Sequence, residues 1–232
     1  MDVILIGGLW LTADVWREVA EGVRARGHRA VPLALPGQGD GNGAATLDDQ
    51  VATVLAAVDG TDGKPLVIGH SAAATLAWIA ADRRPDRVAA VGLIGGFPSS
   101  DGTAYADFFE PVDGQMGFPG WDAFEGPDSA DLDEAARAAM QADMVPVPAG
   151  VSKGTVQYAD ERRSAVPVTL ICPEFGPDDA REWIASGDLP ELAAATALEL
   201  VDIDSGHWPM VSAPDALVSV IADLADRHTA AA

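Results

Sequence analysis

The sequence predicts an α/β fold of three layers (α/β/α), in which helices cover both faces of a mostly parallel sheet. Two observations carry this prediction. Short apolar runs of strand length alternate with helical patterns along most of the chain, and the strands are apolar throughout instead of alternating with polar residues. Strands of that kind are buried on both faces, as in sheets that helices cover on two sides. The 232 residues, 48% of them hydrophobic, suffice for one domain with a sizeable core.

The first half of the chain supplies four strands and the helices that connect them. A helical pattern at residues 14–26 places three valines on one face and stops at Gly27. A second helix begins at Thr46, where Asp49 completes a capping box, and the helix after the third strand ends by Pro85. The strands are expected at residues 3–6, 30–35, 66–68 and 88–94.

The alternation of strands and helices stops after Gly96. Residues 97–165 are rich in proline, glycine and aspartate and predict a single helix, at residues 131–144. We therefore expect residues 97–165 to form a small cap inserted within one domain of residues 1–232. Beyond the insertion, the pattern predicts strands at residues 166–172 and 198–203 and a final helix at residues 214–227.

The charge balance and the cysteine count exclude several classes of partner. The net charge of −22, from 36 acidic and 14 basic residues, disfavours binding to nucleic acid and to anionic membrane surfaces. The single Cys172 cannot form an internal disulfide, and no cysteine or histidine cluster has the spacing of a metal site. The first residues lack the basic start and the small-residue cleavage site expected of a signal peptide, and no apolar run approaches roughly 20 residues. We expect a cytoplasmic protein that needs no metal, flavin or nucleotide cofactor.

A candidate nucleophile lies in the segment 69–73, Gly-His-Ser-Ala-Ala, between an apolar strand and a helical pattern. Such a segment predicts that Ser71 occupies a sharp strand-to-helix turn, with its Oγ exposed beyond the carboxyl end of the sheet. The turn needs small residues two positions before and after the serine. Gly69 and Ala73 meet that need, although the usual pattern has glycine at both positions. A chance serine in a strand-to-helix loop is the alternative.

A serine nucleophile needs a base that accepts its proton near neutral pH, and this base is usually histidine. Two of the four histidines lie away from the expected site: His28 is in a basic turn at the opposite end of the sheet, and His228 is in the C-terminal tail. His70 precedes the serine, where we expect the turn to point it elsewhere. His207 follows the last strand at the same edge as Ser71 and is the predicted base.

The oxyanion that forms when the serine attacks a carbonyl needs N–H donors. One predicted donor is the backbone N–H of Ala72, the residue after the nucleophile. The loop at residues 7–12 begins with two glycines, so its backbone can approach Ser71 and offer the N–H of Leu9. A plain glycine-rich turn or a phosphate loop is the alternative, but the chain lacks the glycine and lysine spacing of a phosphate loop.

With these motifs in this order, the chain resembles the α/β-hydrolase superfamily along essentially its whole length. The matching segments are residues 7–9 (Gly-Gly-Leu), 69–73 (Gly-His-Ser-Ala-Ala) and 206–208 (Gly-His-Trp). Relatives usually have histidine in place of the first of these glycines. The loop at residues 35–39 is similar to the family's Asp-x-x-Gly-x-Gly loop, but it has Ala34 or Leu35 where an acidic residue is common. The resemblance implies a minimal six-stranded core, with residues 97–165 as a cap over the active site.

The resemblance also implies an acid that orients the histidine, usually an aspartate shortly after the penultimate strand. Aligning residues 167–176 with that pattern puts Gly176 where the aspartate belongs. Glu174 is preferred because it directly follows the strand and its longer side chain can make up the displacement. Asp178, two residues after the expected position, and Asp101, after the preceding strand, remain open as alternatives.

Aromatic residues gather near the expected mouth of the site. Trp10, Phe97 and Trp208 are expected to line an apolar pocket for the acyl or alcohol group. Phe118 and three further aromatic residues of the cap lie near the same mouth. Those three, Phe108, Phe109 and Trp121, can equally pack within the cap. No cationic residue is evidently placed to bind a carboxylate or phosphate. An uncharged ester, thioester or lactone is therefore the expected substrate.

These residues support three hypotheses of different class. The leading one is a serine hydrolase that cleaves a small molecule through an acyl-enzyme, with Ser71, His207 and Glu174 as its catalytic residues. The second is a non-hydrolytic enzyme of the same fold, such as a cofactor-free dioxygenase or a lyase, which the displaced acid motivates. The third is a ligand-binding protein that has kept the pocket. We expect a monomer or a homodimer in each case.

Overall fold

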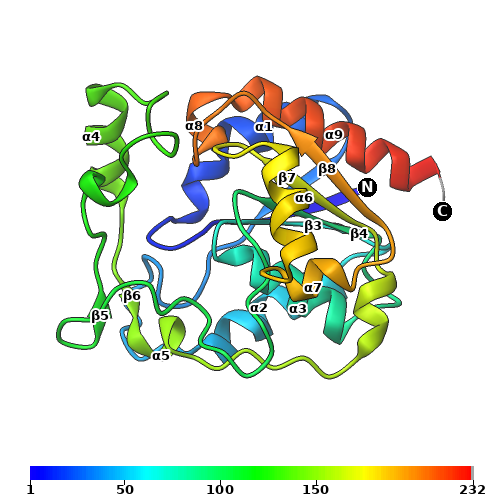
Figure 1. The fold of residues 1–232 in the computed structure, drawn as a ribbon, viewed down its shortest axis with the longest axis horizontal. Helices are drawn as coiled ribbons and strands as arrows, with labels where there is room; N and C mark the ends of the chain where they lie inside the picture. Colours follow the sequence, from blue (N-terminus) through cyan, green and yellow to red (C-terminus); the bar gives the residue numbers. More distant parts are fainter. Residues whose placement is uncertain (231–232) are drawn as a thin grey trace.

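The computed structural model describes residues 1–230 and contains one six-stranded sheet in which every pairing is parallel (Figure 1). The strand order is β2-β1-β3-β4-β7-β8. The strands are β1 (Asp2–Ile6), β2 (Arg29–Pro32), β3 (Leu66–His70), β4 (Ala90–Ile94), β7 (Val168–Cys172) and β8 (Leu198–Asp202). All six predicted strands are present. The second ends earlier than predicted, since Leu33–Leu35 continue beyond the sheet toward the loop at Pro36.

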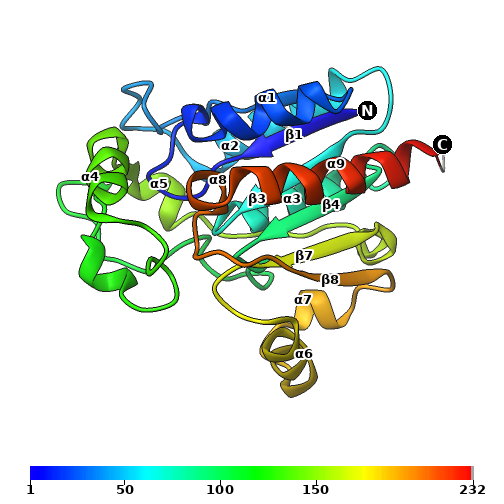
Figure 2. The same ribbon diagram turned by 90° about the horizontal axis from the view of Figure 1, so that it is seen from above.

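Helices cover both faces of this sheet, as predicted (Figure 2). Alternate residues of β1 point to opposite sides: Val3 and Leu5 belong to one core cluster, Ile4 and Ile6 to the other. The first cluster is completed by the helices α1 (Arg17–Ala25) and α9 (Pro214–Ala230). The second is completed by α2 (Leu47–Asp59), α3 (Ala73–Arg83), α6 (Pro177–Ser186) and α7 (Pro190–Ala193).

Residues 97–165, which we call the cap segment, leave the sheet after β4 and return to it at β7. Most of this segment lies at the end of the sheet where the strands finish, and its last residues return along α3 to the opposite end, where β7 begins (Figure 1). The predicted helix at 131–144 is α4 (Glu134–Asp143), and the side chain of Asp133 caps it by accepting the N–H of Ala136 at 2.8 Å. Within the cap segment, the elements not predicted are the paired strands β5 (Gln115–Met116) and β6 (Val147–Pro148), the helix α5 (Ala149–Ser152), and the 3-10 helices η2 (Trp121–Phe124) and η3 (Glu161–Ala165). Outside it, the helices α6, α7 and α8 (Pro209–Ser212) were not predicted either.

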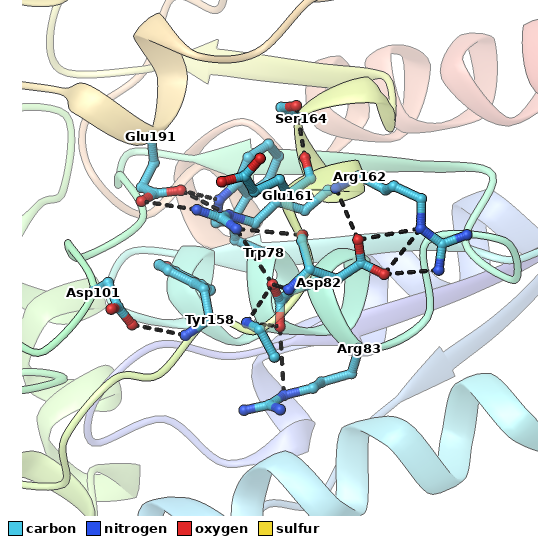
Figure 3. A network of polar contacts seen from close by, with 12 residues as sticks. Trp78, Asp82, Arg83, Asp101, Tyr158, Glu161, Arg162, Ser164 and Glu191 are labelled. Carbon is cyan, nitrogen blue, oxygen red and sulfur yellow. Dashed lines mark hydrogen bonds and ion pairs between the residues drawn. The ribbon is translucent and has the colours of Figure 1, made fainter.

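A buried ionic network fastens the returning end of the cap segment to the last turn of α3 (Figure 3). The carboxylate of Asp82, which is fully buried, accepts the backbone N–H groups of Ala159 and Asp160 at 2.9 Å. Arg163 lies between this carboxylate and that of Glu191, at 3.4 and 2.9 Å. Because every buried charge here faces an opposite charge or a hydrogen-bond donor, the network holds the cap segment to the core.

No helix within residues 1–230 is both long enough and apolar enough to cross a membrane.

Candidate active site

Ser71 occupies a strained turn between β3 and α3. Its φ of +54° is unusual for a residue with a side chain, and its N–H is held at 2.8 Å by the carbonyl of Ile94. A Cβ on Gly69 would overlap the backbone of Ala73, and one on Gly96 would overlap the carbonyl of Ser71. The close approach of three backbone segments therefore explains why the turn needs small residues.

The structure brings Ser71, His207 and Glu174 together from three separate loops. Ser71 Oγ lies 2.9 Å from His207 Nε2, and His207 Nδ1 lies 2.6 Å from Glu174 Oε1. The side chains of the histidine and the glutamate are only 12% and 13% exposed. With the Nδ1 proton donated to Glu174, Nε2 is free to accept the serine proton, which is the arrangement that a serine nucleophile requires.

The two alternative acids lie elsewhere. Asp178 is almost fully exposed at the start of α6 and pairs with Arg181. Asp101 accepts the backbone N–H of Tyr158 at 2.8 Å, next to the network around Asp82 (Figure 3). Among the three candidates, Glu174 is the one whose carboxylate meets the ring of His207.

A glycine makes room for the histidine and its acid. A Cβ on Gly95 would lie 3.1 Å from Glu174 Oε2 and 3.2 Å from His207 Nδ1, and the φ of +55° also favours glycine there. This Oε2 is buried without a hydrogen-bond partner among residues 1–230. Sequence reasoning missed Gly95, although two consecutive glycines directly after a buried strand indicate a close approach of backbone.

The expectation that His70 points away from the site is wrong. Its side chain is buried beside His207, with ring centroids 4.9 Å apart, and its Nε2–H donates to the carbonyl of His207 at 2.7 Å. Burial first, and then the neighbouring His207 ring, lower the pKa of His70 to about 3. His70 is therefore a neutral donor that holds the backbone of His207.

The loop that carries the predicted oxyanion donor Leu9 is held by the cap segment. The next residue, Trp10, has a φ of +65°, which is strained for a bulky side chain. Its indole N–H donates to the carbonyl of Met116 at 3.0 Å, and its carbonyl accepts the N–H of Val145 at 3.0 Å. Two cap residues thus fix the conformation of the residue that follows Leu9.

A pair of buried glutamines fixes the same loop from the other side. The amide of Gln38 donates to the carbonyls of Gly8 at 2.9 Å and Leu11 at 2.8 Å, and its oxygen accepts from Gln50 at 3.0 Å. Sequence reasoning missed both glutamines. The available signal was a polar residue within the first two turns of α2, on the face that otherwise packs inward.

A pocket of about 240 Å³ opens over the serine. It is lined mainly by apolar and aromatic side chains, and Ser71, His70 and His207 are its polar members. The remaining lining residues are Leu9, Trp10, Phe108, Phe109, Phe124 and Trp208. Phe124 was not among the predicted pocket residues.

The expectation that Phe97 lines this pocket is not met. Its ring packs against Phe175 and Trp183, with centroids 5.3 and 5.8 Å away, so the turn after β4 directs it toward α6. The cap aromatics Phe118 and Trp121 pack against neighbouring rings instead: Phe118 contacts Trp10 at 5.5 Å, and Trp121 contacts Trp208 at 5.2 Å.

A six-stranded parallel sheet that brings a serine, a carboxylate and a histidine to its carboxyl edge, in that chain order, defines the α/β-hydrolase class. Residues 3–220 match the sequence model of the alpha/beta hydrolase family, and the chain belongs to that family. This confirms the predicted family and fold, and with them the expectation of an enzyme of the hydrolase class.

Similar proteins cover nearly the whole chain. Methylesterase 7 of Arabidopsis thaliana is 24% identical over 97% of this chain and 96% of its own. An extracellular α/β-hydrolase from a Paenibacillus species superposes with a TM-score of 0.77 at 18% identity, over 96% of this chain and 98% of its own. A pyrethroid hydrolase from Sphingobium faniae superposes with a TM-score of 0.76 at 21% identity, over 97% of both chains.

Proposed function

We propose that this protein is a serine esterase that acts through an acyl-enzyme. The observation that carries the proposal is the continuous hydrogen-bonded series from Ser71 Oγ to His207 and on to Glu174, at 2.9 and 2.6 Å. The likeness to a methylesterase along 97% of the chain supports the same reaction class.

In this mechanism Ser71 Oγ attacks the ester carbonyl carbon while its proton passes to His207 Nε2. Glu174 stabilises the imidazolium that forms. The N–H groups of Leu9 and Ala72 bind the oxyanion, and each such donor contributes about 2.7–4 kcal/mol to the transition state. His207 then gives the proton to the leaving alcohol, which departs and leaves an acyl-serine. Water then attacks this acyl group while His207 Nε2 takes its proton, and His207 returns the proton to Ser71 Oγ as the acyl–oxygen bond breaks and the acid leaves.

The pocket favours a small, uncharged ester with an apolar acyl group. A volume of about 240 Å³ lies just below the usual range for small-molecule sites, and none of the nine lining residues is a lysine or an arginine. A substrate carboxylate or phosphate would therefore lose its hydration without gaining a countercharge. Thioesters and lactones present the same carbonyl chemistry and fall within the proposal.

Labelling with a fluorophosphonate probe tests the nucleophile. The wild type should be labelled and should hydrolyse short p-nitrophenyl and methyl esters, whereas Ser71→Ala should do neither. Ser219→Ala, which changes an exposed serine on α9, is the matched control and should behave as the wild type. Labelling that survives in Ser71→Ala would overturn the proposal, and turnover of a substrate without an acyl intermediate would favour a dioxygenase or lyase.

The compartment and the assembly belong to the same proposal. We propose a cytoplasmic monomer or homodimer. The cysteine count supports the compartment, because the single Cys172 leaves the chain without an internal disulfide. Light scattering on the purified protein determines the assembly, and fractionation of cells that express it determines the compartment. Recovery of the protein in the culture medium would contradict the cytoplasmic assignment.

A further inference from the structure

The loop that carries His207 is hydrogen-bonded to the cap segment through its backbone. The N–H of Gly206 donates to Oδ2 of Asp131 at 2.6 Å, and the N–H of His207 itself donates to the carbonyl of Asp128 at 2.7 Å. Together with the bond from His70 to the His207 carbonyl, these contacts hold both sides of the histidine's backbone. Two of the three come from the cap segment.

Asp131 is an exposed residue, but the residues next to Asp128 and Asp131 in the chain are firmly held. Leu132 is 5% exposed and belongs to the same core cluster as Trp208. Ser129 is fully buried; its hydroxyl donates to the carbonyl of Phe124 at 2.7 Å, and its own carbonyl accepts from Arg137 at 2.5 Å. The turn at residues 128–131 is therefore a fixed support rather than a segment that lies loosely over the site.

The two segments meet without space between them. A Cβ on Gly206 would overlap the Asp131 carboxylate and would lie 2.5 Å from the carbonyl of Asp128. A displacement of the 128–131 turn therefore shifts the backbone of residues 206–207, and the imidazole moves with it. Because Nε2 must stay within hydrogen-bond distance of Ser71 Oγ, a shift of this kind acts on the proton transfer.

We propose that Asp131 is a positioning residue for the catalytic histidine, and that the cap segment is thereby a working part of the proton-transfer apparatus. This proposal rests on the proposed esterase function. Asp131 contacts neither the substrate pocket nor the reacting atoms; it acts through the peptide N–H of Gly206.

Three variants test this role by steady-state kinetics. Asp131→Ala removes the acceptor and should lower kcat by about ten- to hundredfold with little change in KM. Asp131→Asn keeps an oxygen that can accept the Gly206 N–H and should restore most of the lost kcat. Asp133→Ala is the matched control, because it removes a carboxylate two residues away that caps α4 and does not contact the histidine loop.

The outcomes separate a positioning role from a structural one. The proposal is overturned if Asp131→Ala and Asp133→Ala lower the melting temperature by the same amount and have the same kcat. It is also overturned if Asp131→Asn is as slow as Asp131→Ala. Should Asp131→Ala fail to fold, Gly206→Ala separates the same two segments by a single methyl group and should give the same loss of kcat.

A measurement without turnover keeps this test distinct from that of the esterase function. The proton that His207 Nδ1 donates to Glu174 at 2.6 Å should give a downfield NMR resonance in the wild type. In Asp131→Ala this resonance should shift or broaden, while in Asp133→Ala it should stay in place. If the wild type proves inactive on every ester, the esterase proposal fails, and an unshifted resonance in Asp131→Ala refutes the positioning role separately.

Discussion

Two clusters of buried polar side chains lie at opposite ends of α3 and differ in how fully their polar atoms are paired. At the C-terminal end, both oxygens of Asp82 and both oxygens of Glu191 have hydrogen-bond or ionic partners. At the N-terminal end, Glu174 bonds to His207 through Oε1 only, and its Oε2 is buried without a partner among residues 1–230. The Nδ1 atom of His70 is unpaired in the same way.

This difference separates a cluster that holds the fold from the proposed catalytic one. Unpaired buried polar atoms cost free energy, so a protein retains them where another requirement applies. Around Ser71 that requirement is a histidine free to exchange a proton. Around Asp82 there is no such requirement, and its carboxylate is matched on every side. The two clusters should therefore respond in opposite ways to substitution.

The largest expected effect is the loss of activity in Ser71→Ala. Removal of the nucleophile should lower kcat by at least about 10⁴-fold, while the melting temperature stays near that of the wild type because no fold-holding contact is lost. Ester hydrolysis and thermal unfolding, measured on the same preparation, check the expected loss of kcat and the expected melting temperature. A fall in melting temperature comparable to that of an Asp82 variant would remove the distinction between the two clusters.

The reverse pattern is expected for Asp82→Ala. Removing the Asp82 carboxylate leaves the N–H groups of Ala159 and Asp160 without their acceptor and takes from Arg163 one of its two carboxylate partners. The loss should destabilise the fold by about 3–5 kcal/mol, while kcat of the folded fraction is retained. Denaturant unfolding gives the first quantity and active-site titration the second. Asp86→Ala is the matched control: it breaks an exposed pair with Arg162 and should cost no more than about 1 kcal/mol. Equal losses in the two variants would show that burial is not the cause.

A third test concerns acid stability and the buried His70. Its pKa is 6.5 in an ordinary environment and about 3 in the folded protein, so below pH 6.5 the unfolded chain binds a proton that the folded chain excludes. The contribution of the uncharged His70 to the free energy of unfolding is therefore complete above pH 6.5. It declines by about 1.4 kcal/mol per pH unit as the pH falls toward 3. In His70→Gln this contribution to the slope should vanish. If the wild type and His70→Gln give parallel curves of unfolding free energy against pH, the low pKa of His70 is contradicted.

The sheet could be predicted from sequence because its signals are local. Each strand is an apolar run, and the turn at Ser71 needs small neighbours in the chain itself. The cap segment could not be predicted in detail, since β5 and β6 are two residues each and pair across 30 positions. The wrong expectations, for Phe97 and His70, are both side-chain directions at the ends of strands. Directions there depend on tight turns that the pattern does not specify.

The smallest effect tests whether full pairing always marks a fold-holding role. The amide of Gln38 bonds to Gly8, Leu11 and Gln50, yet it supports the loop of the proposed oxyanion donor. Gln38→Met keeps the volume but cannot donate, so the loop should relax and kcat should fall by about tenfold.

Gln115→Met is the matched control for this variant, because its amide donates only to the carbonyl of Gly43 at 3.3 Å at the edge of the cap segment. Its kcat should stay at the wild-type value. Unfolding measurements on the same two variants separate the effects. If Gln38→Met loses stability without losing kcat, then complete pairing does mark a structural role, and the oxyanion loop keeps its shape through the contacts of Trp10 with the cap segment.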